Sequence, residues 1–376
     1  MRVLYVASDQ TLPGETGGSV HVHEVSRELA KRGHEVHAVV QDRGEASPGE
    51  GYTIHRIRWT PSHRLFRFRA RPQIKALIDR LKPDVLMERY YNFGGEGILA
   101  AEASGVPSLL EVNSPIVDHD ESLKALLDAL LIVRPMRAYR ERLVHSARAL
   151  ISPIKEIVPE FARAKTHTLT WGANVEAFHP SRRSEARRAS WGATPQTTVV
   201  LFSGSHRPWH GVATLEAAAR LLKDRADVLF VFAGGETEGV ATDFRGRRMG
   251  RVPYRDMPEV TASADISVAP YDRSRLRSLK LGFFWSPLKI FEALASGVPI
   301  ITLDIPPLNE IVRDGLEGVF FKENDAADLA RVIGSLSGDR DLRLDMAKNA
   351  RERAPQFSWA AHAAQVESIL LGLRVA

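Results

Sequence analysis

One local pattern occurs twice in this chain: a short apolar segment, a glycine-containing loop, and a segment whose apolar residues recur at helical spacing. The first copy spans residues 3–30 and the second spans residues 198–222. Apolar runs followed by helical periodicity predict a strand and then a helix. Strands that alternate with helices form parallel sheets with helices on both faces. We therefore predict an α/β protein with two doubly wound parallel sheets.

The alternation continues through both halves of the chain. Further strands are expected at residues 36–40, 84–88, 108–112, 150–152, 228–233, 266–269 and 298–302, and further helices at 94–103 and 357–373. A length of 376 residues fits two domains of common size. We predict a first domain at 1–178, a second at 179–355, and a C-terminal helix at 356–376 that packs back on the first domain. The Arg-rich stretch 181–190 is interpreted as the linker.

Composition limits the function classes. The chain has no cysteine, which excludes disulfides, thiolate metal sites and a thiol nucleophile. Its net charge of +5 suits acidic partners such as nucleotide diphosphates, lipid phosphates or nucleic acid, although a solvated basic surface explains it equally well. The N-terminus resembles a strand more than a signal peptide, and no apolar run is long enough for a bilayer. We therefore expect a cytoplasmic protein.

Two glycine-containing loops are candidate anion sites. Gly17 and Gly18 lie between the first strand and helix, where a backbone approaches ligands closely and a helix N-terminus favours an anion. The dinucleotide fingerprint G-x-G-x-x-G is absent, so a plain tight turn is an equal reading. The second loop holds Gly204 and Ser205 with the cationic candidates Arg207 and His210, a set that suits the binding of a diphosphate. The alternative is an ordinary βα loop whose basic residues are incidental.

A third cluster, residues 286–300, is the most informative. Ser286 and Pro287 are read as an N-cap and a proline at the first helical position, followed by Leu288 and Lys289. Amides there suit phosphate binding. Glu292 lies about two turns into the same helix, where a carboxylate can accept hydrogen bonds from ribose hydroxyls. Solvent exposure is the usual fate of such a residue, but its apolar neighbours favour a partly buried one.

The ends of two strands in the first half carry polar side chains. Glu88 and Arg89 close one predicted strand, and Asn113 follows another. Ligands of α/β proteins bind at the carboxyl ends of strands, so these three residues are candidates for acceptor binding. A structural salt bridge or a loop cap explains them equally well.

Residues 55–71 interleave six arginines with apolar side chains. This pattern suits the peripheral face of a membrane with anionic lipid, an acidic acceptor, or a solvated surface. Nucleic-acid binding is not expected, because no recognised binding module is present.

Several motifs together resemble the family 4 glycosyltransferases, which are retaining enzymes of the GT-B fold. The motifs are Gly17-Gly18 with residues 32–36, and residues 171–180, 233–235, 253–271 and 291–315. The resemblance implies two Rossmann-like domains that face a cleft, with the acceptor in the N-terminal domain and a nucleotide-sugar in the C-terminal domain. It implies a glycan, lipid-linked or small-molecule acceptor, and neither a metal nor a cofactor.

The resemblance also implies residue roles. The expected donor-binding residues are Gly17, Gly18, Gly204, Ser205, Ser286, Pro287, Leu288 and Glu292. Glu292 matches the second glutamate of the family's E-x7-E motif. Arg207, His210 and Lys289 are the expected catalytic cations, with Arg207 preferred over His210 because histidine is only partly charged near neutral pH.

Three departures from the family pattern stand out. The first glutamate of E-x7-E falls at Phe284, which we interpret as the mark of a subgroup with a Ser-Pro-Leu-Lys donor segment. The usual Arg and Lys of the second cluster fall at Ser205 and His210, and Asn113 replaces a histidine common in relatives. A non-catalytic nucleotide-sugar or glycan-binding protein is therefore the alternative. An epimerase would need titratable groups around the sugar, and we can assign no such set.

Overall fold

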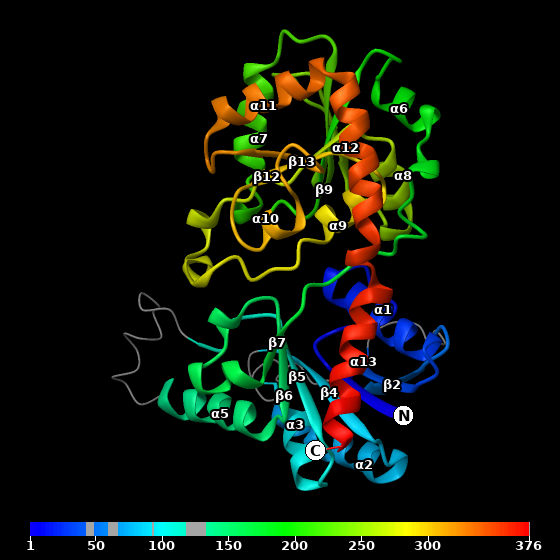
Figure 1. The fold of residues 1–376 in the computed structure, drawn as a ribbon, viewed down its shortest axis with the longest axis vertical. Coiled ribbons are helices and arrows are strands. Elements are labelled where there is room, and N and C mark those ends of the chain that lie inside the picture. Colours follow the sequence, from blue (N-terminus) through cyan, green and yellow to red (C-terminus); the bar gives the residue numbers. More distant parts are fainter. Residues whose placement is uncertain (43–48, 59–66, 92–93, 118–132, 376) are drawn as a thin grey trace. The chain divides into compact units, whose positions relative to one another are not determined.

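The structure, a computed structural model, describes residues 1–42, 49–58, 67–91, 94–117 and 133–375 (Figure 1). The chain divides into two compact units. Unit 1 comprises Met1–Trp171, Lys280–Ser286 and Trp359–Ala376, and unit 2 comprises Gly172–Leu279 and Pro287–Ser358. The predicted division after residue 178 therefore differs from the observed one by a few residues. Unit 1 also includes the short segment Lys280–Ser286, which the sequence does not indicate.

Unit 1 is built on a seven-stranded parallel sheet of order β3-β2-β1-β4-β5-β6-β7. Its elements are β1 (Arg2–Ala7), α1 (Gly17–Lys31), β2 (Glu35–Gln41), β3 (Thr53–Ile57), α2 (Arg71–Leu81), β4 (Val85–Tyr90), α3 (Glu96–Ala103), β5 (Ser108–Val112), α5 (Val133–Ser146), β6 (Ala149–Ser152), β7 (Thr166–Thr168) and α13 (Trp359–Val375). The central strands are almost wholly buried, as expected for a sheet covered on both faces.

The C-terminal helix α13 belongs to unit 1, where it packs against α1 (Figure 1). Glu367 of α13 forms an ion pair with Arg32 and a hydrogen bond with His34, and both of these residues follow α1. Arg374 pairs with Asp84 at the start of β4. These contacts fix the last helix of the chain to the first sheet.

Unit 2 is built on a six-stranded sheet of order β10-β9-β8-β11-β12-β13. Its elements are α6 (Glu185–Trp191), β8 (Thr198–Ser203), α7 (Val212–Leu221), β9 (Val228–Val240), β10 (Gly246–Gly250), α8 (Met257–Ala262), β11 (Ile266–Val268), α9 (Leu288–Ala295), β12 (Ile300–Leu303), α10 (Leu308–Ile311), β13 (Gly318–Phe321), α11 (Ala326–Gly338) and α12 (Arg340–Arg353). Pairing is parallel throughout, with register shifts between β9 and β10.

The prediction of two α/β units with parallel sheets is confirmed. The linker prediction for residues 181–190 was wrong. Ser184 caps helix α6, and Arg188 of that helix is buried in unit 2. The Arg188 guanidinium donates to the carbonyls of Ser263 and Thr197 and to Asp265. An arginine-rich stretch is usually exposed, and here tertiary partners bury one of its members.

Candidate functional site

The carboxyl ends of β8 and β11 are neighbours in the sheet of unit 2, although β9 and β10 lie between them in the chain. Such a switch in strand order creates a crevice where α/β proteins bind ligands. The loop after β8 begins with Gly204, which has a φ of 135°. The Nζ atom of Lys289, on α9, lies 3.1 Å from the place that a Cβ would take at Gly204. The second and third predicted clusters therefore meet at this end of the sheet.

Lys289 is buried, and its ammonium finds no hydrogen-bond acceptor among the residues that the structure describes. The ammonium lies 4.3 Å from the centre of the Phe202 ring and 5.2 Å from that of Tyr271, so two aromatic faces stabilise its charge. Burial lowers the pKa of Lys289 to about 7, against the attraction of Glu292. A buried amine with unused donors is suited to bind an anion.

Glu292 is buried on the same helix, three residues after Lys289. Burial raises the pKa of Glu292 to about 7, while a hydrogen bond from Tyr254 and the charge of Lys289 act to lower it. Burial therefore opposes the charged forms of both Lys289 and Glu292, and an anion bound beside Lys289 would favour its ammonium form. The structure brings Glu292 and Lys289 together on α9 as predicted. The ribose contact of Glu292 stays a prediction.

His210 does not supply the charge that its position suggests. Its Nδ1 atom hydrogen-bonds the carbonyl oxygen of Ser205. Burial lowers the pKa of His210 to about 3, and the nearby charge of Lys289 lowers it further, so the ring is neutral at physiological pH. The expectation that His210 acts as a cation was therefore wrong. Arg207 is exposed, with its guanidinium 6.0 Å from the centre of the Trp209 ring, and is the permanent charge of this loop.

The helix cap predicted at Ser286 was also wrong. Helix α9 begins at Leu288 and its N-cap is Pro287, whose ψ of 81° lies outside the helical range. Ser286 therefore lies one residue before the cap. Its hydroxyl accepts a hydrogen bond of 3.1 Å from the Trp171 backbone N–H, within unit 1.

In unit 1, Gly17 and Gly18 are the first residues of α1 and not part of the loop before it. Thr16 caps this helix by accepting a hydrogen bond from the Ser19 N–H. A Cβ at Gly18 would lie 2.5 Å from Oε1 of Gln10, so glycine allows the Gln10 side chain to pack on the helix start. A ligand contact at these glycines stays a prediction.

A polar network lies at the carboxyl ends of β1, β4 and β5, where the strand order of the seven-stranded sheet in unit 1 switches between β1 and β4. Its centre is Glu111, whose Oε1 contacts His21 at 2.7 Å, Asn113 at 2.6 Å and Arg89 at 3.4 Å. Its Oε2 accepts a hydrogen bond from Tyr5. Burial alone would raise the pKa of Glu111, but these donors lower it well below its usual range. Glu111 is therefore a buried anion.

Arg89 and Asn113 belong to this network, as their strand-end positions suggest. The Arg89 guanidinium lies 5.3 Å from the centre of the Trp171 ring. The Asn113 amide donates to Glu111 and its oxygen accepts from the Trp171 indole N–H at 3.2 Å. The interpretation of these residues as structural partners thus has direct support. Acceptor binding by Arg89 or Asn113 stays a prediction.

Glu88 was predicted to bind the acceptor, but its contacts give it a structural role. It is fully buried, and its two carboxylate oxygens accept hydrogen bonds from the backbone N–H groups of Gly95 and Ile98. These amides belong to the start of α3, so Glu88 satisfies donors that a helix N-terminus leaves unpaired. The acceptor-binding assignment of Glu88 is therefore corrected to that of a helix cap.

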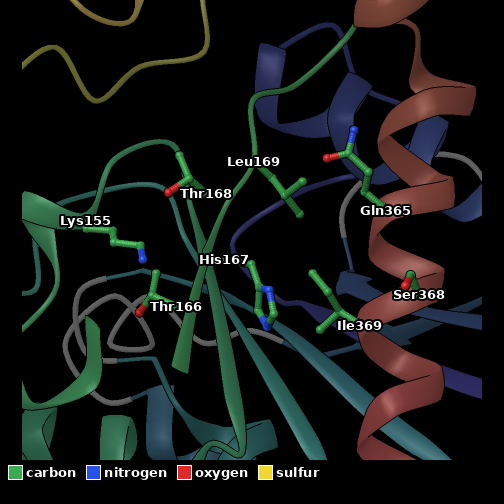
Figure 2. Close-up of a pocket in the computed structure, with 8 residues that line it drawn as sticks. All are labelled: Lys155, Thr166, His167, Thr168, Leu169, Gln365, Ser368 and Ile369. Atoms are coloured by element: carbon green, nitrogen blue, oxygen red, sulfur yellow. The ribbon is translucent and has the colours of Figure 1, made fainter. Parts of the chain in front are cut away.

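A separate hollow of about 430 Å³ lies in unit 1 along β7 and α13. Figure 2 shows its lining, which is Lys155, Thr166, His167, Thr168, Leu169, Gln365, Ser368 and Ile369. None of the predicted site residues lines it. The strand-switch sites described above are therefore distinct from this hollow.

Part of the basic stretch 55–71 lies outside the described residues, namely 59–66. Of the others, Ile57 is buried in β3, and Arg56 donates to the carbonyl of Leu12 at 2.9 Å. Both residues are therefore used within unit 1, and membrane contact stays a prediction. In the described part of the chain no helix combines the length and apolarity that a membrane crossing needs. The same part contains no group of three or more His, Cys, Asp or Glu residues arranged to hold a metal ion.

Three further residues belong to these two sites without having been predicted, namely Asp9, His21 and Tyr271. Asp9 lies two residues after β1, so the strand-end rule that selected Asn113 would also have selected it. His21 gave no comparable signal, because an aromatic residue between Val20 and Val22 is expected in the core, and Tyr271 entered only as the last residue of the family-like run 253–271.

Comparisons with known proteins bear on both units. Residues 16–167 match the family described as Glycosyltransferase Family 4, and residues 183–353 match Glycosyl transferases group 1. A D-inositol 3-phosphate glycosyltransferase of Geodermatophilus obscurus is 28% identical, over 93% of this chain and 84% of that protein. An N,N'-diacetylbacillosaminyl-diphospho-undecaprenol alpha-1,3-N-acetylgalactosaminyltransferase of Campylobacter jejuni is 30% identical, over 50% of this chain and 48% of that protein.

Among solved structures, Anabaena HepE in complex with UDP superposes with a TM-score of 0.74 at 16% identity, over 99% of this chain and 100% of that one. At that identity the likeness concerns the fold alone. With a family 4 match in its N-terminal part and a group 1 match in its C-terminal part, the chain is similar to glycosyltransferases along nearly its whole length, and its fold is GT-B.

Proposed function

We propose that this chain is a retaining, metal-independent glycosyltransferase that moves a hexose from a nucleoside-diphosphate sugar to a hydroxyl of an acceptor. Unit 2 binds the donor and unit 1 the acceptor. The observation that carries the proposal is the buried ammonium of Lys289, which lies beside Gly204 at the strand switch without a hydrogen-bond acceptor among the described residues. A diphosphate supplies the acceptor oxygens that this amine lacks.

The roles of the other residues follow from their chemistry. Arg207 is exposed on the same loop and provides a permanent charge for the leaving diphosphate. His210 is neutral and serves as a hydrogen-bonding group. Glu292 accepts hydrogen bonds from the ribose. Lys289 and Arg207 supply the positive charge that a metal ion supplies in other transferases, and we therefore propose a metal-independent reaction.

The comparisons support a broad acceptor class. One relative is named for an inositol phosphate and another for a lipid-linked acceptor. A solved structure of the same fold was obtained with UDP, which makes UDP-sugars the first donors to test. We propose a glycan, lipid-linked or small-molecule acceptor, and retention of configuration by analogy with the family 4 enzymes.

The test is a turnover assay with a panel of UDP-, ADP- and GDP-sugars, with and without a chelator. We expect transfer or slow hydrolysis of at least one donor, unaffected by the chelator, and a product of the donor's anomeric configuration by NMR. Tight binding of a nucleotide-sugar without turnover would favour the non-catalytic alternative. Loss of activity that a divalent ion restores would contradict metal independence.

A further inference from the structure

Asp9 is a buried carboxylate with an unused oxygen. It lies two residues beyond β1, and its side chain is 7% exposed. Its Oδ2 accepts hydrogen bonds from the Gln10 amide and from Nε of Arg89 at 3.3 Å. Its Oδ1 is shielded from solvent and accepts no hydrogen bond from any described residue. A buried polar atom without a partner is rare in folded proteins and calls for an explanation.

The neighbouring carboxylates differ from Asp9 in this respect. Glu111, at the end of β5, uses both oxygens within its network. Glu88, in β4, uses both on the start of α3. Of the three acidic side chains at these strand ends, Asp9 is thus the one with an unpaired hydrogen-bond acceptor.

The surroundings hold Asp9 in place. Arg89 bridges Asp9 and Glu111, so the guanidinium is fixed from both sides. Gln10 is held by the hydroxyls of Thr16 and Ser19 at the start of α1. A carboxylate that is anchored through one oxygen and has an unpaired acceptor at the other is preorganised for a ligand.

We propose that Asp9 binds a hydroxyl group of the sugar or polyol acceptor. An ionised carboxylate only accepts hydrogen bonds, so its partner must be a donor such as a hydroxyl. The position at the β1–β4 strand switch is where an α/β unit binds ligands. In unit 2 the Lys289 ammonium is available to the phosphates of the donor. In unit 1 the Asp9 carboxylate is available to the hydroxyl of the acceptor. This inference rests on the proposed function, and Asp9 acts in it as a binding residue.

The experiment is a ligand-observed NMR titration of the full chain, saturated with UDP, using myo-inositol and the methyl α-glycosides of glucose, mannose and N-acetylglucosamine. The best binder is compared with its monodeoxy analogues, on wild type and on Asp9→Asn. We expect Asp9→Asn to weaken binding about tenfold or more, as for a lost hydrogen bond to a charged group. Removal of one particular hydroxyl should weaken binding to wild type but hardly to Asp9→Asn.

Asp79→Asn is the matched control, because Asp79 is an exposed carboxylate of α2 paired with Lys75. It should leave sugar binding unchanged. The proposal is overturned if every deoxy analogue loses the same affinity for wild type as for Asp9→Asn. It is also overturned if wild type binds UDP but none of the sugar probes. If UDP itself does not bind wild type, the proposed function fails instead. Should Asp9→Asn not fold, the 13C resonance of the wild-type Asp9 carboxylate decides: it must shift when sugar is added.

Discussion

The ammonium of Lys289 lies 4.3 Å from the centre of the Phe202 ring, at the carboxyl end of a central strand. Among the described residues no carboxylate forms an ion pair with it, and it has no hydrogen-bond acceptor. An aromatic face stabilises a cation only partly, so the arrangement is complete when an anion binds. This relationship leads to the first two predictions.

Replacing Lys289 with methionine should weaken UDP binding roughly tenfold to a hundredfold, the usual size of a hydrogen bond between charged groups. The side chain keeps its length and apolar packing, so the fold should persist. Isothermal titration calorimetry measures the affinity. Lys322→Met is the control, since Lys322 is an exposed lysine of the same unit. Equal affinities for wild type and Lys289→Met would remove Lys289 from the donor site.

Gly204→Ala should impair UDP binding as well as stability. Gly204 has a φ of 135°, and an added Cβ would lie 3.1 Å from the Lys289 ammonium. The backbone strain should cost about 1–3 kcal/mol of unfolding free energy. Gly192→Ala separates the two effects, because Gly192 also has a positive φ but nothing within 4 Å of its Cβ position. If both variants bind UDP like wild type, the close approach at Gly204 has no role in the site.

Arg207→Ala should reduce kcat more than it weakens UDP binding. Its guanidinium is exposed and carries no ion pair among described residues, so the fold does not depend on it. A charge that acts on the developing negative charge of the leaving group affects the transition state most. Steady-state kinetics beside calorimetry gives the comparison. Equal losses in rate and affinity would mean that Arg207 serves only ground-state binding.

Acid should destabilise unit 1 through His362. Burial lowers the pKa of His362 from 6.5 to about 4 in the folded protein, and its Nδ1 hydrogen-bonds the Thr170 carbonyl. The unfolded chain therefore binds a proton first as the pH falls. The stabilisation is complete above pH 6.5 and is lost between pH 6.5 and 4, up to about 3 kcal/mol. Urea unfolding at a series of pH values measures the unfolding free energy. Between pH 6.5 and 4 this free energy should fall less steeply for His362→Gln than for wild type, and the same slope for both would refute the assignment.

Arg188→Met should lower the unfolding free energy of unit 2 by about 3–5 kcal/mol, because it leaves Asp265 and two carbonyl groups without their buried donor. The neighbouring Arg187 forms a half-exposed pair with Glu259, so Arg187→Met should cost about 1 kcal/mol or less. Chemical denaturation of the two variants side by side is the measurement. Similar values for both would show that Arg188 is not a structural anchor.

The fold followed from the sequence to a large extent, because buried parallel strands leave continuous apolar runs and their helices keep helical spacing. The limits of this reasoning are visible at single residues. Arg188 reads as surface because arginine usually is exposed, and only the tertiary structure supplies its three buried acceptors. Ser286 and Pro287 read as a cap and a first helical residue, but the backbone of Pro287 is not helical and moves the helix start to Leu288.

The candidate site followed less completely. The glycine loop after a strand indicated Gly204, and the helix of the third cluster indicated Lys289 and Glu292; the structure brings Gly204 and Lys289 together. The rule that ligands bind at strand ends misassigned Glu88, since its partners are backbone amides of the next helix, which no side-chain pattern reveals. The charge of His210 could not be predicted from the sequence either, because it depends on burial and on the nearby charge of Lys289.

The most direct test of the account is a crystal structure of the full chain with UDP. The account predicts a phosphate oxygen within hydrogen-bond distance of the Lys289 ammonium and the ribose hydroxyls at Glu292. UDP bound away from both residues, or Lys289 still without a partner beside bound UDP, would contradict it.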